Sequence, residues 1–217
     1  MRVLVFGGTG KIGRALVAEA RARGHDVSIA RPPGAGSVEP GPELAGVPVV
    51  PADVLDTAAV RSAAGGAQVV ISAVGPRLGA DDADVVVRAA RSLCAAVDGL
   101  PVRLVVVGGA GSLRVAPGVD FVGSPDFPSF ARPTSLAARD ALEVYRAQAS
   151  GVDWLMVCPP ALIGDGARTG RYQRGGDELL RGGDGQSRIS RADFAVAVLE
   201  EVEEPRASRR RITVAEP

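Results

Sequence analysis

A glycine loop near the N-terminus constrains the fold more than any other segment of the chain. Gly7, Gly10 and Gly13 recur every third residue, directly after the apolar residues 3–6 and at the start of a segment with helical spacing. Glycine permits a tight turn between a strand and a helix, and it lets another group approach the backbone closely. The pattern therefore predicts a β-strand, a turn and an α-helix as the first unit of an α/β fold.

The rest of the chain repeats this alternation of strands and helices. Apolar, Val-rich runs predict strands at residues 2–6, 25–31, 47–51, 67–73, 102–107, 153–158 and 211–215. Periodic segments predict helices at residues 11–23, 56–64, 82–97, 134–150 and 190–203, with Thr134 and Ser190 as N-caps. Residues 32–46, 108–133 and 164–187 are expected to be loops or irregular segments.

Short buried strands separated by helices predict a doubly wound, Rossmann-type parallel sheet with helices on both faces. We expect one domain over residues 1–217, with a small substrate-side region formed by residues 108–133 and 159–189. This architecture would bring the loops that follow the strands together at one edge of the sheet.

Composition argues against several classes of protein. The 25 basic residues balance 25 acidic residues, so the net charge favours neither nucleic acid nor an acidic membrane as a partner. No apolar stretch reaches the roughly 18 residues of a membrane span, and Met1 leads directly into a strand rather than a secretion signal. Cys94 and Cys158 are expected to be free thiols of a cytoplasmic protein. A single histidine, His25, gives no support to a metal site or a Ser-His-Asp triad.

The glycine loop has the features of a phosphate site. The first N–H groups of the predicted helix and its dipole would point at an anion, and the only lysine of the chain, Lys11, adds a positive charge there. A Walker-type loop is excluded, because no Gly-Lys-Ser/Thr sequence follows the glycines at the required spacing. The alternative to nucleotide binding is a purely structural turn. The residues expected to bind the pyrophosphate of a dinucleotide are Gly7, Thr9, Gly10, Lys11, Ile12 and Gly13.

The end of the second strand discriminates between the two nicotinamide dinucleotides. An NAD site usually offers a carboxylate there, whereas this chain has Arg31. A guanidinium pairs well with a 2′-phosphate, so NADP(H) is favoured over NAD(H), unless Arg31 is only a solvated charge. Asp53 and Val54 are placed to meet adenine, although Asp53 could instead cap a helix near Asp56. After the fourth strand, small residues could pass close to the ribose or form a simple turn: Ala73, Val74 and Gly75.

Taken together, these motifs resemble the atypical short-chain dehydrogenases/reductases. The branch concerned is the NAD(P)-binding one that contains NmrA-like proteins and biliverdin reductase B-like flavin reductases. The segments 108–112 (Gly-Gly-Ala-Gly-Ser), 159–162 (Pro-Pro-Ala-Leu) and 188–195 also match, so the resemblance covers nearly the whole chain. It implies that Pro159 lies against the nicotinamide. It also implies that Ser112 hydrogen-bonds a substrate carbonyl, unless Ser112 is only a turn residue.

The catalytic pair of the superfamily is absent. Its usual Tyr-x-x-x-Lys motif lies on the helix after the fifth strand, and the matching positions here hold Ser135 and Arg139. Serine is a poor proton donor, and arginine cannot tune a phenol as lysine does. Neither Tyr145 nor Tyr172 is followed by a lysine four residues later. Biliverdin reductase B-like proteins also carry a histidine shortly after Pro-Pro, where this chain has alanine and leucine.

Several functions remain open at this point. One is a reductase in which NADPH passes hydride directly to a flavin, quinone or other conjugated small molecule, with the proton taken from water. Another is a non-catalytic regulator that senses NADP(H), and a third is an isomerase or cyclase that uses the nucleotide as a scaffold. Arg168, Arg171 and Tyr172 could grip a substrate or could belong to a solvated loop. The protein is expected to be a monomer or a homodimer.

Overall fold

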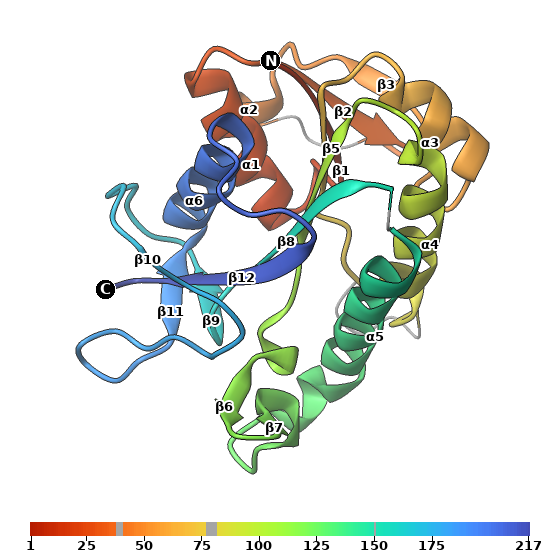
Figure 1. The fold of residues 1–217 in the computed structure, drawn as a ribbon. Helices are drawn as coiled ribbons and strands as arrows, with labels where there is room; N and C mark the ends of the chain where they lie inside the picture. The colour runs from red at the N-terminus through yellow and green to blue at the C-terminus, as the bar shows by residue number, and fades with distance from the viewer. Residues whose placement is uncertain (38–40, 77–81, 150) are drawn as a thin grey trace.

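An eight-stranded sheet forms the centre of the computed structural model, which describes residues 1–37, 41–76, 82–149 and 151–217. The strand order is β10-β12-β8-β5-β4-β1-β2-β3 (Figure 1). All neighbours pair in parallel except β10 and β12, which are antiparallel. The strands are β1 (Arg2–Phe6), β2 (Asp26–Arg31), β3 (Val49–Pro51), β4 (Val69–Ser72), β5 (Arg103–Val107), β8 (Asp153–Cys158), β10 (Gln173–Gly175) and β12 (Arg210–Ala215).

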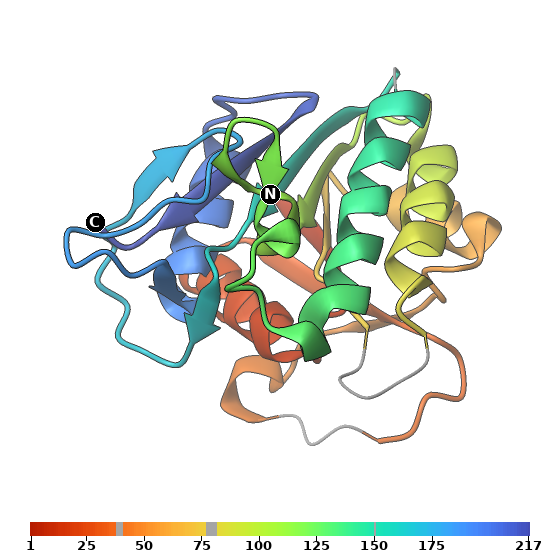
Figure 2. The ribbon, with the colours of Figure 1, turned by 90° about the horizontal axis from the view of Figure 1, so that it is seen from below.

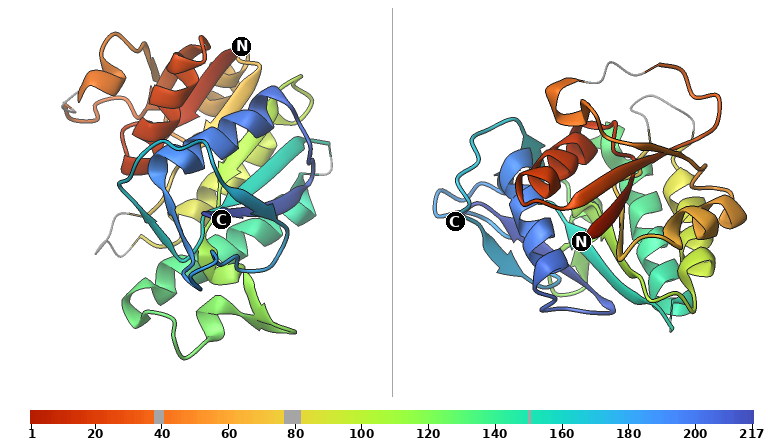
Figure 3. Two further views of the ribbon diagram at one scale, coloured as in Figure 1. Left: turned by 90° about the vertical axis from the view of Figure 1, so that its left-hand side faces the viewer. Right: turned by 90° about the horizontal axis from the view of Figure 1, so that it is seen from above.

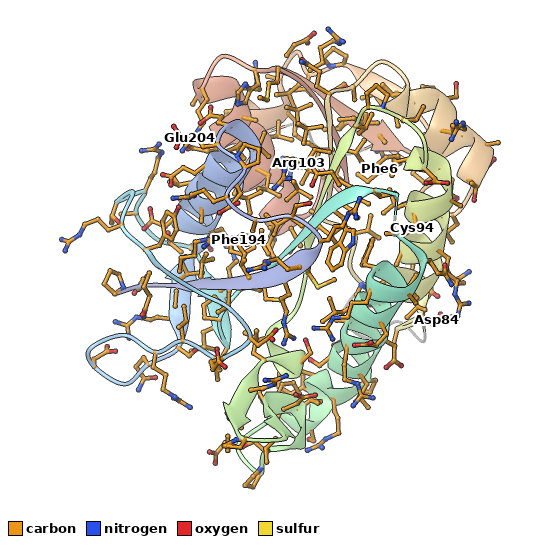
Figure 4. The ribbon with its side chains drawn as sticks, in the orientation of Figure 1. Phe6, Asp84, Cys94, Arg103, Phe194 and Glu204 are labelled. Carbon is orange, nitrogen blue, oxygen red and sulfur yellow. The ribbon has the colours of Figure 1, made fainter. Side chains whose placement is uncertain are left out.

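Helices cover both faces of this sheet. One face carries α1 (Lys11–Ala22), α2 (Gly41–Leu44) and α6 (Arg191–Glu203); the other carries α3 (Thr57–Ala64), α4 (Val85–Val97) and α5 (Arg132–Gln148) (Figure 2). Alternate residues of a strand face opposite sides, so Phe6 packs under α3–α5, whereas its neighbour Val5 packs under α1 and α6. Phe6 and Phe194, labelled in Figure 4, belong to these two separate cores. The predicted Rossmann-type architecture is confirmed.

Small elements build up the region beyond the carboxyl ends of the strands. Strands β6 (Arg114–Ala116) and β7 (Val119–Asp120) form a hairpin at the bottom of Figure 1, which also protrudes in the left view of Figure 3. Strand β9 (Leu162–Gly164) pairs in parallel with β11 (Arg188–Ser190). Three single 3-10 turns, η1 (Ala110–Ser112), η2 (Phe121–Gly123) and η3 (Ser129–Ala131), complete the region.

These elements correct the expectation that residues 108–133 and 164–187 are irregular. The first segment folds because Phe121, Val122 and Phe127 bury their side chains in a cluster of their own. The second contains β10, whose pairing with β12 depends on a partner about 40 residues away, which local sequence does not reveal. The short helix α2 likewise lies within the predicted loop 32–46, of which residues 38–40 fall outside the described part.

The two predicted N-caps have different outcomes. Ser190 does cap α6, because its hydroxyl accepts a hydrogen bond of 2.9 Å from the Asp193 N–H. Thr134 does not cap α5, which begins two residues earlier at Arg132 because proline is tolerated in a first helical turn. The Thr134 hydroxyl instead donates to the Ala131 carbonyl. The predicted end of this helix at Ser150 lies outside the described residues.

Candidate functional site

Two adjoining cavities follow the carboxyl-terminal edge of the sheet. The first, of about 590 Å³, lies over the ends of β1, β2 and β3 and is called here the β1–β3 cavity. The second, of about 420 Å³, lies between α4, α5 and the ends of β4, β5 and β8 and is called the α5 cavity. Both are lined by Ala73, Val74 and Gly75, so the two cavities adjoin along this segment, and together they are called the cleft. The cleft crosses the point between β1 and β4 at which the strand order reverses, where doubly wound sheets bind ligands.

The glycine loop is packed tightly between α1 and β4. A Cβ atom on Gly13 would lie 2.1 Å from the Gly7 carbonyl oxygen, and a Cβ on Gly7, whose φ is +75°, would lie 2.6 Å from the Ala73 carbonyl. Gly10 differs from both, since its Cβ would lie 3.4 Å from its nearest neighbour. Packing therefore requires glycine at positions 7 and 13, whereas at position 10 glycine leaves open space in the β1–β3 cavity.

The start of α1 lies at the junction of the two cavities. Gly10 is the N-cap residue and offers no side-chain hydrogen bond, so the first N–H groups of the helix lack a side-chain cap. Thr9 and Gly10 line the β1–β3 cavity, and Ile12 lines the α5 cavity. Uncapped N–H groups and the positive end of the helix dipole at this point are suited to a phosphate group.

Lys11 lies on the other side of this first turn. Its side chain is exposed and borders a third, open depression with Arg14 and Arg191. It does not line either cavity of the cleft. The structure thus brings the backbone of the glycine loop to the cleft, but not the ammonium group expected to accompany it.

The β1–β3 cavity contains the residues expected near the adenosine end of a nucleotide. Arg31 lies at the end of β2, is half-buried, and donates a hydrogen bond to the Gly36 carbonyl. An Asp53 carboxylate oxygen accepts a hydrogen bond of 2.9 Å from the Leu55 N–H. Asp56, not Asp53, caps α3 through the N–H groups that follow it, so the capping alternative for Asp53 is wrong. Val54 lines the same cavity beside Asp53.

The α5 cavity is lined by one face of α5. Ser135, Ala138, Ala141 and Tyr145 recur at helical spacing and face the cavity together with Thr134. Its other walls come from α4, the strand ends and neighbouring loops: Ile12, Ser72, Ala73, Val74, Gly75, Pro76, Val86, Ala89, Val106, Val107, Gly108, Gly109, Met156 and Ile163. Arg139 does not join them; its guanidinium reaches the Asp140 carboxylate at 3.4 Å and its side chain is 43% exposed. The structure therefore places Ser135, but not Arg139, in the cleft.

Two other predicted contact residues lie outside the cleft lining. Ser112 is buried, and the Arg211 guanidinium donates hydrogen bonds of 2.8 Å to both its hydroxyl and its carbonyl oxygen. Pro159 is also buried and borders neither cavity. The chain reaches the α5 cavity again four residues later, at Ile163.

Two of the three candidate substrate-binding residues after β9 make their side-chain hydrogen bonds to other parts of the fold. Arg168 donates two hydrogen bonds, of 2.7 and 2.8 Å, to the buried Glu19 carboxylate, and these bonds lower the pKa of Glu19. The Tyr172 hydroxyl donates to the Glu200 carboxylate. Within the described ranges, no three His, Cys, Asp or Glu side chains gather to hold a metal ion, and no helix has the length and apolar character to cross a bilayer.

Comparison with known proteins agrees with this geometry. The model of a family described as NAD(P)H-binding matches residues 7–205. The chain belongs to the NAD(P)H-binding family. Membership confirms the resemblance to the NAD(P)-binding short-chain dehydrogenases/reductases, and it supports a nicotinamide dinucleotide as the cofactor of the chain. The elongated cleft and the uncapped start of α1 fit that ligand.

Several relatives span the whole chain. It is 34% identical to the uncharacterised Bacillus subtilis protein YwnB over an alignment of 219 positions, which covers 99% of this chain and 98% of YwnB. A solved structure of a candidate exported protein from Burkholderia pseudomallei is 38% identical, with a TM-score of 0.86 and coverage of 99% of both chains. A candidate NADH–flavin reductase from Streptococcus pneumoniae is 28% identical, with a TM-score of 0.85 and complete coverage of both chains. A candidate epimerase from Bacteroides thetaiotaomicron is 30% identical, with a TM-score of 0.85 and coverage of 99% and 96%.

Sequence reasoning did not identify the inner wall of the α5 cavity. It considered Tyr145 only as a member of a Tyr-Lys pair and did not consider Ala138 or Ala141. The available signal was the spacing of three and four residues that places these side chains on the face of α5 shared with Ser135.

Proposed function

We propose that this protein is an NADPH-dependent reductase that delivers hydride directly to a flavin, quinone or other conjugated small molecule. The observation that carries the proposal is the cleft, which joins a nucleotide-sized cavity at the glycine loop to a mainly apolar cavity beside Ser135. Bound NADPH supplies the hydride from its reduced nicotinamide ring. A conjugated acceptor spreads the resulting charge and can take its proton from water, so the missing Tyr-Lys pair is not required. The Streptococcus pneumoniae relative, a candidate NADH–flavin reductase, supports this reaction class.

Different residues of the cleft bind different parts of the nucleotide. The N–H groups of Lys11 and Ile12 at the start of α1 hold the pyrophosphate, because the Gly10 N–H already donates to the Gly7 carbonyl. Gly7, Thr9, Gly10 and Gly13 shape the loop. Asp53 accepts a hydrogen bond from the adenine amino group. The remaining contacts are with the ribose, the adenine ring and the nicotinamide side, and they are made by Ala73, Val74, Gly75, Val54 and Ile12.

Arg31 is proposed to select NADP(H) over NAD(H). It borders the β1–β3 cavity at the end of β2, and Asp26, the acid of that strand, lies at the strand's other end. The Arg31→Ala variant should raise the Kd for NADPH roughly 10- to 100-fold, the loss expected for a charged hydrogen bond, and change the Kd for NADH less than about twofold. Arg210→Ala, at an exposed site on β12, is the control. An equal effect of Arg31→Ala on both dinucleotides would refute the assignment.

Turnover tests the reaction itself. Purified protein should consume NADPH in the presence of riboflavin, FMN or a simple quinone, with the proton taken from water. Tight NADPH binding without turnover across flavins, quinones and conjugated ketones would reject the reductase and favour an NADP(H)-sensing regulator. We place the protein in the cytoplasm, where its cofactor and its two free thiols would be maintained.

One comparison favours a second candidate, an isomerase that uses the nucleotide as a scaffold. The Bacteroides thetaiotaomicron relative is a candidate epimerase and is 30% identical. An isomerase would convert substrate to product with no net consumption of NADPH. Measuring NADPH loss against product formation therefore separates the two reactions.

A further inference from the structure

A buried arginine on the last strand holds the loop that follows β5, called here the 108–113 loop. Arg211 is the second residue of β12, and only 4% of its side chain is exposed. One guanidinium nitrogen donates hydrogen bonds of 2.8 Å to both the hydroxyl and the carbonyl oxygen of Ser112. The other two nitrogens donate to one carboxylate oxygen of Asp177, at 2.9 and 2.5 Å. All three nitrogens of the guanidinium are therefore bonded within the protein.

Asp177 connects this arginine to the segment after β10. Burial opposes the ionisation of Asp177, but the hydrogen bonds from Arg211 outweigh it and lower the pKa of the carboxyl below its ordinary value. The Asp177 carbonyl accepts a hydrogen bond of 2.8 Å from the Arg114 N–H, and the Leu179 N–H donates to the Arg114 carbonyl at 2.9 Å. Leu179 in turn packs against the cluster around Phe121. One ion pair thus ties β12 to the segments that follow β5 and β10.

The 108–113 loop is also a wall of the α5 cavity. Two of its residues, Gly108 and Gly109, line this cavity. A Cβ atom on Gly111 would lie 2.5 Å from the Ser135 Cβ, so the loop lies directly against the face of α5 that lines the cavity. The next residue along the chain is the one that Arg211 holds. The loop is therefore fixed between α5 on one side and Arg211 on the other.

The contacts of Arg211 lie at one end of the cleft only. The register of β12 on β8 places Arg211 beside Met156, which lines the α5 cavity. Neither Arg211 nor its partners Ser112 and Asp177 line the β1–β3 cavity. Strands β8, β5, β4 and β1 separate β12 from β2. A displacement of the 108–113 loop would thus change the α5 cavity and leave the β1–β3 cavity intact.

We propose that Arg211 is a positioning residue, which sets the shape of the α5 cavity for the nicotinamide ring and the acceptor. It acts through Ser112 and the 108–113 loop and touches neither ligand. The inference rests on the proposed reductase function, in which nicotinamide and acceptor meet in this cavity, and it adds the residue that fixes the cavity wall. Such a residue matters because a misplacement of about 1 Å, caused far from the reacting atoms, can lower a rate about 100-fold.

Arg211→Lys is the test variant, because an ammonium group keeps the charge but cannot reproduce the planar fork that meets Ser112 and Asp177 together. Two ligands report on the two cavities in calorimetric titrations. NADPH would occupy both, whereas 2′-phospho-ADP-ribose lacks the nicotinamide and would occupy only the β1–β3 cavity. We expect the Kd for NADPH to rise about 3- to 10-fold and the Kd for 2′-phospho-ADP-ribose to change less than about twofold. The kcat/KM for riboflavin or menadione should fall about 10- to 100-fold.

Arg103→Lys is the matched control. Arg103, labelled in Figure 4, is the first residue of β5 and so lies at the end of that strand opposite the 108–113 loop. Its side chain is 8% exposed and donates two hydrogen bonds of 2.8 Å to Asp153 and one of 2.7 Å to the Ala207 carbonyl. It lines neither cavity of the cleft. Both lysine variants should lower the urea midpoint of unfolding, but only Arg211→Lys should change the Kd for NADPH.

A milder pair of variants removes the charge of each partner carboxylate. The side chains of Asp177 and Asp153 are 35% and 47% exposed, so Asp177→Asn and Asp153→Asn leave no fully buried group behind. Asp177→Asn weakens the hold on Arg211 and should raise the Kd for NADPH in the same way as Arg211→Lys, by a smaller factor. Asp153→Asn should leave this Kd unchanged.

The outcomes separate this proposal from the function on which it rests. Unchanged NADPH affinity together with unchanged kcat/KM in both Arg211→Lys and Asp177→Asn would overturn it. Equal losses of affinity for NADPH and 2′-phospho-ADP-ribose, or equal effects of Arg211→Lys and Arg103→Lys, would also overturn it, since they would reflect a general loss of stability. A wild-type protein that consumes no NADPH with any acceptor would reject the reductase, whereas a selective loss of NADPH affinity in Arg211→Lys would still support Arg211 as the residue that shapes the nicotinamide end.

Discussion

Substitution of Gly13 tests whether the glycine loop is held by close packing. The added Cβ of Gly13→Ala would lie 2.1 Å from the Gly7 carbonyl oxygen and 2.8 Å from the Gly8 Cα, where ordinary contacts begin at 3.4 Å. Both obstacles are backbone, so α1 or the loop has to move by about 1 Å, and overpacking of this kind costs roughly 1–3 kcal/mol or more. We expect a lower free energy of unfolding and a loss of NADPH binding together.

Gly10→Ala is the matched substitution in the same loop. Its Cβ would lie 3.4 Å from the nearest atom, so the fold has room for it, and the cost is roughly 0.5–1 kcal/mol, the difference between glycine and alanine at an N-cap. The methyl group would, however, stand in the β1–β3 cavity, where the pyrophosphate approaches the backbone. The Kd for NADPH should rise at least about tenfold, equivalent to about 1.4 kcal/mol.

The assay combines urea unfolding with calorimetric titration of NADPH. Gly65→Ala is a neutral control, because Gly65 has helical dihedral angles and its Cβ would make only ordinary contacts of 3.6 Å. A Gly13→Ala variant as stable as the wild type would refute the packing argument. A Gly10→Ala variant that binds NADPH with unchanged affinity would refute the position assigned to the phosphates.

Two further predictions concern titratable groups. Burial raises the pKa of the Cys94 and Cys158 thiols to about 12. Neither thiol should therefore react with a thiol reagent at pH 8 before the protein unfolds, and reaction of one thiol in the folded protein would contradict this. Hydrogen bonds from Arg168 lower the pKa of Glu19, so its carboxylate stabilises the fold above about pH 4.5, and this contribution is lost as the pH falls through the lower folded pKa. Glu19→Gln should cost about 1–3 kcal/mol at pH 7 and should weaken the loss of stability with falling pH. Glu204→Gln, at the exposed residue that follows α6, should do neither, and the same dependence of stability on pH in the two variants would contradict the assignment.

Seven of the eight strands of the main sheet were predictable because they carry their own signal. Runs such as residues 102–107 are apolar, β-branched and bounded by turns, and helices with an apolar face follow them. The short strands β9, β10 and β11 carry no such signal, since each has three residues and exists only through a partner distant in sequence. Thr134 was misjudged as a cap because side-chain preference at one position could not reveal that the helix starts before Pro133.

The site was predictable where the backbone defines it. Gly7, Gly10 and Gly13 located the loop, since only close approach of main-chain atoms demands that spacing. Directions of long side chains were not predictable, because they depend on how α5 and α1 are rotated in the packed fold. Hence Lys11 borders a different depression, Ser112 is held by Arg211, and the place of Tyr145 in the cleft was missed.

The place of β12 in the sheet has a consequence for synthesis. This strand lies between β8 and β10, both of which leave the ribosome before it does. Until residues 210–215 emerge, β10 has no strand to pair with and β8 keeps an open edge, which is a template for association with other chains. Nascent chains in which residues 210–215 have not yet emerged should therefore need chaperones, whereas chains in which these residues have emerged can close the sheet.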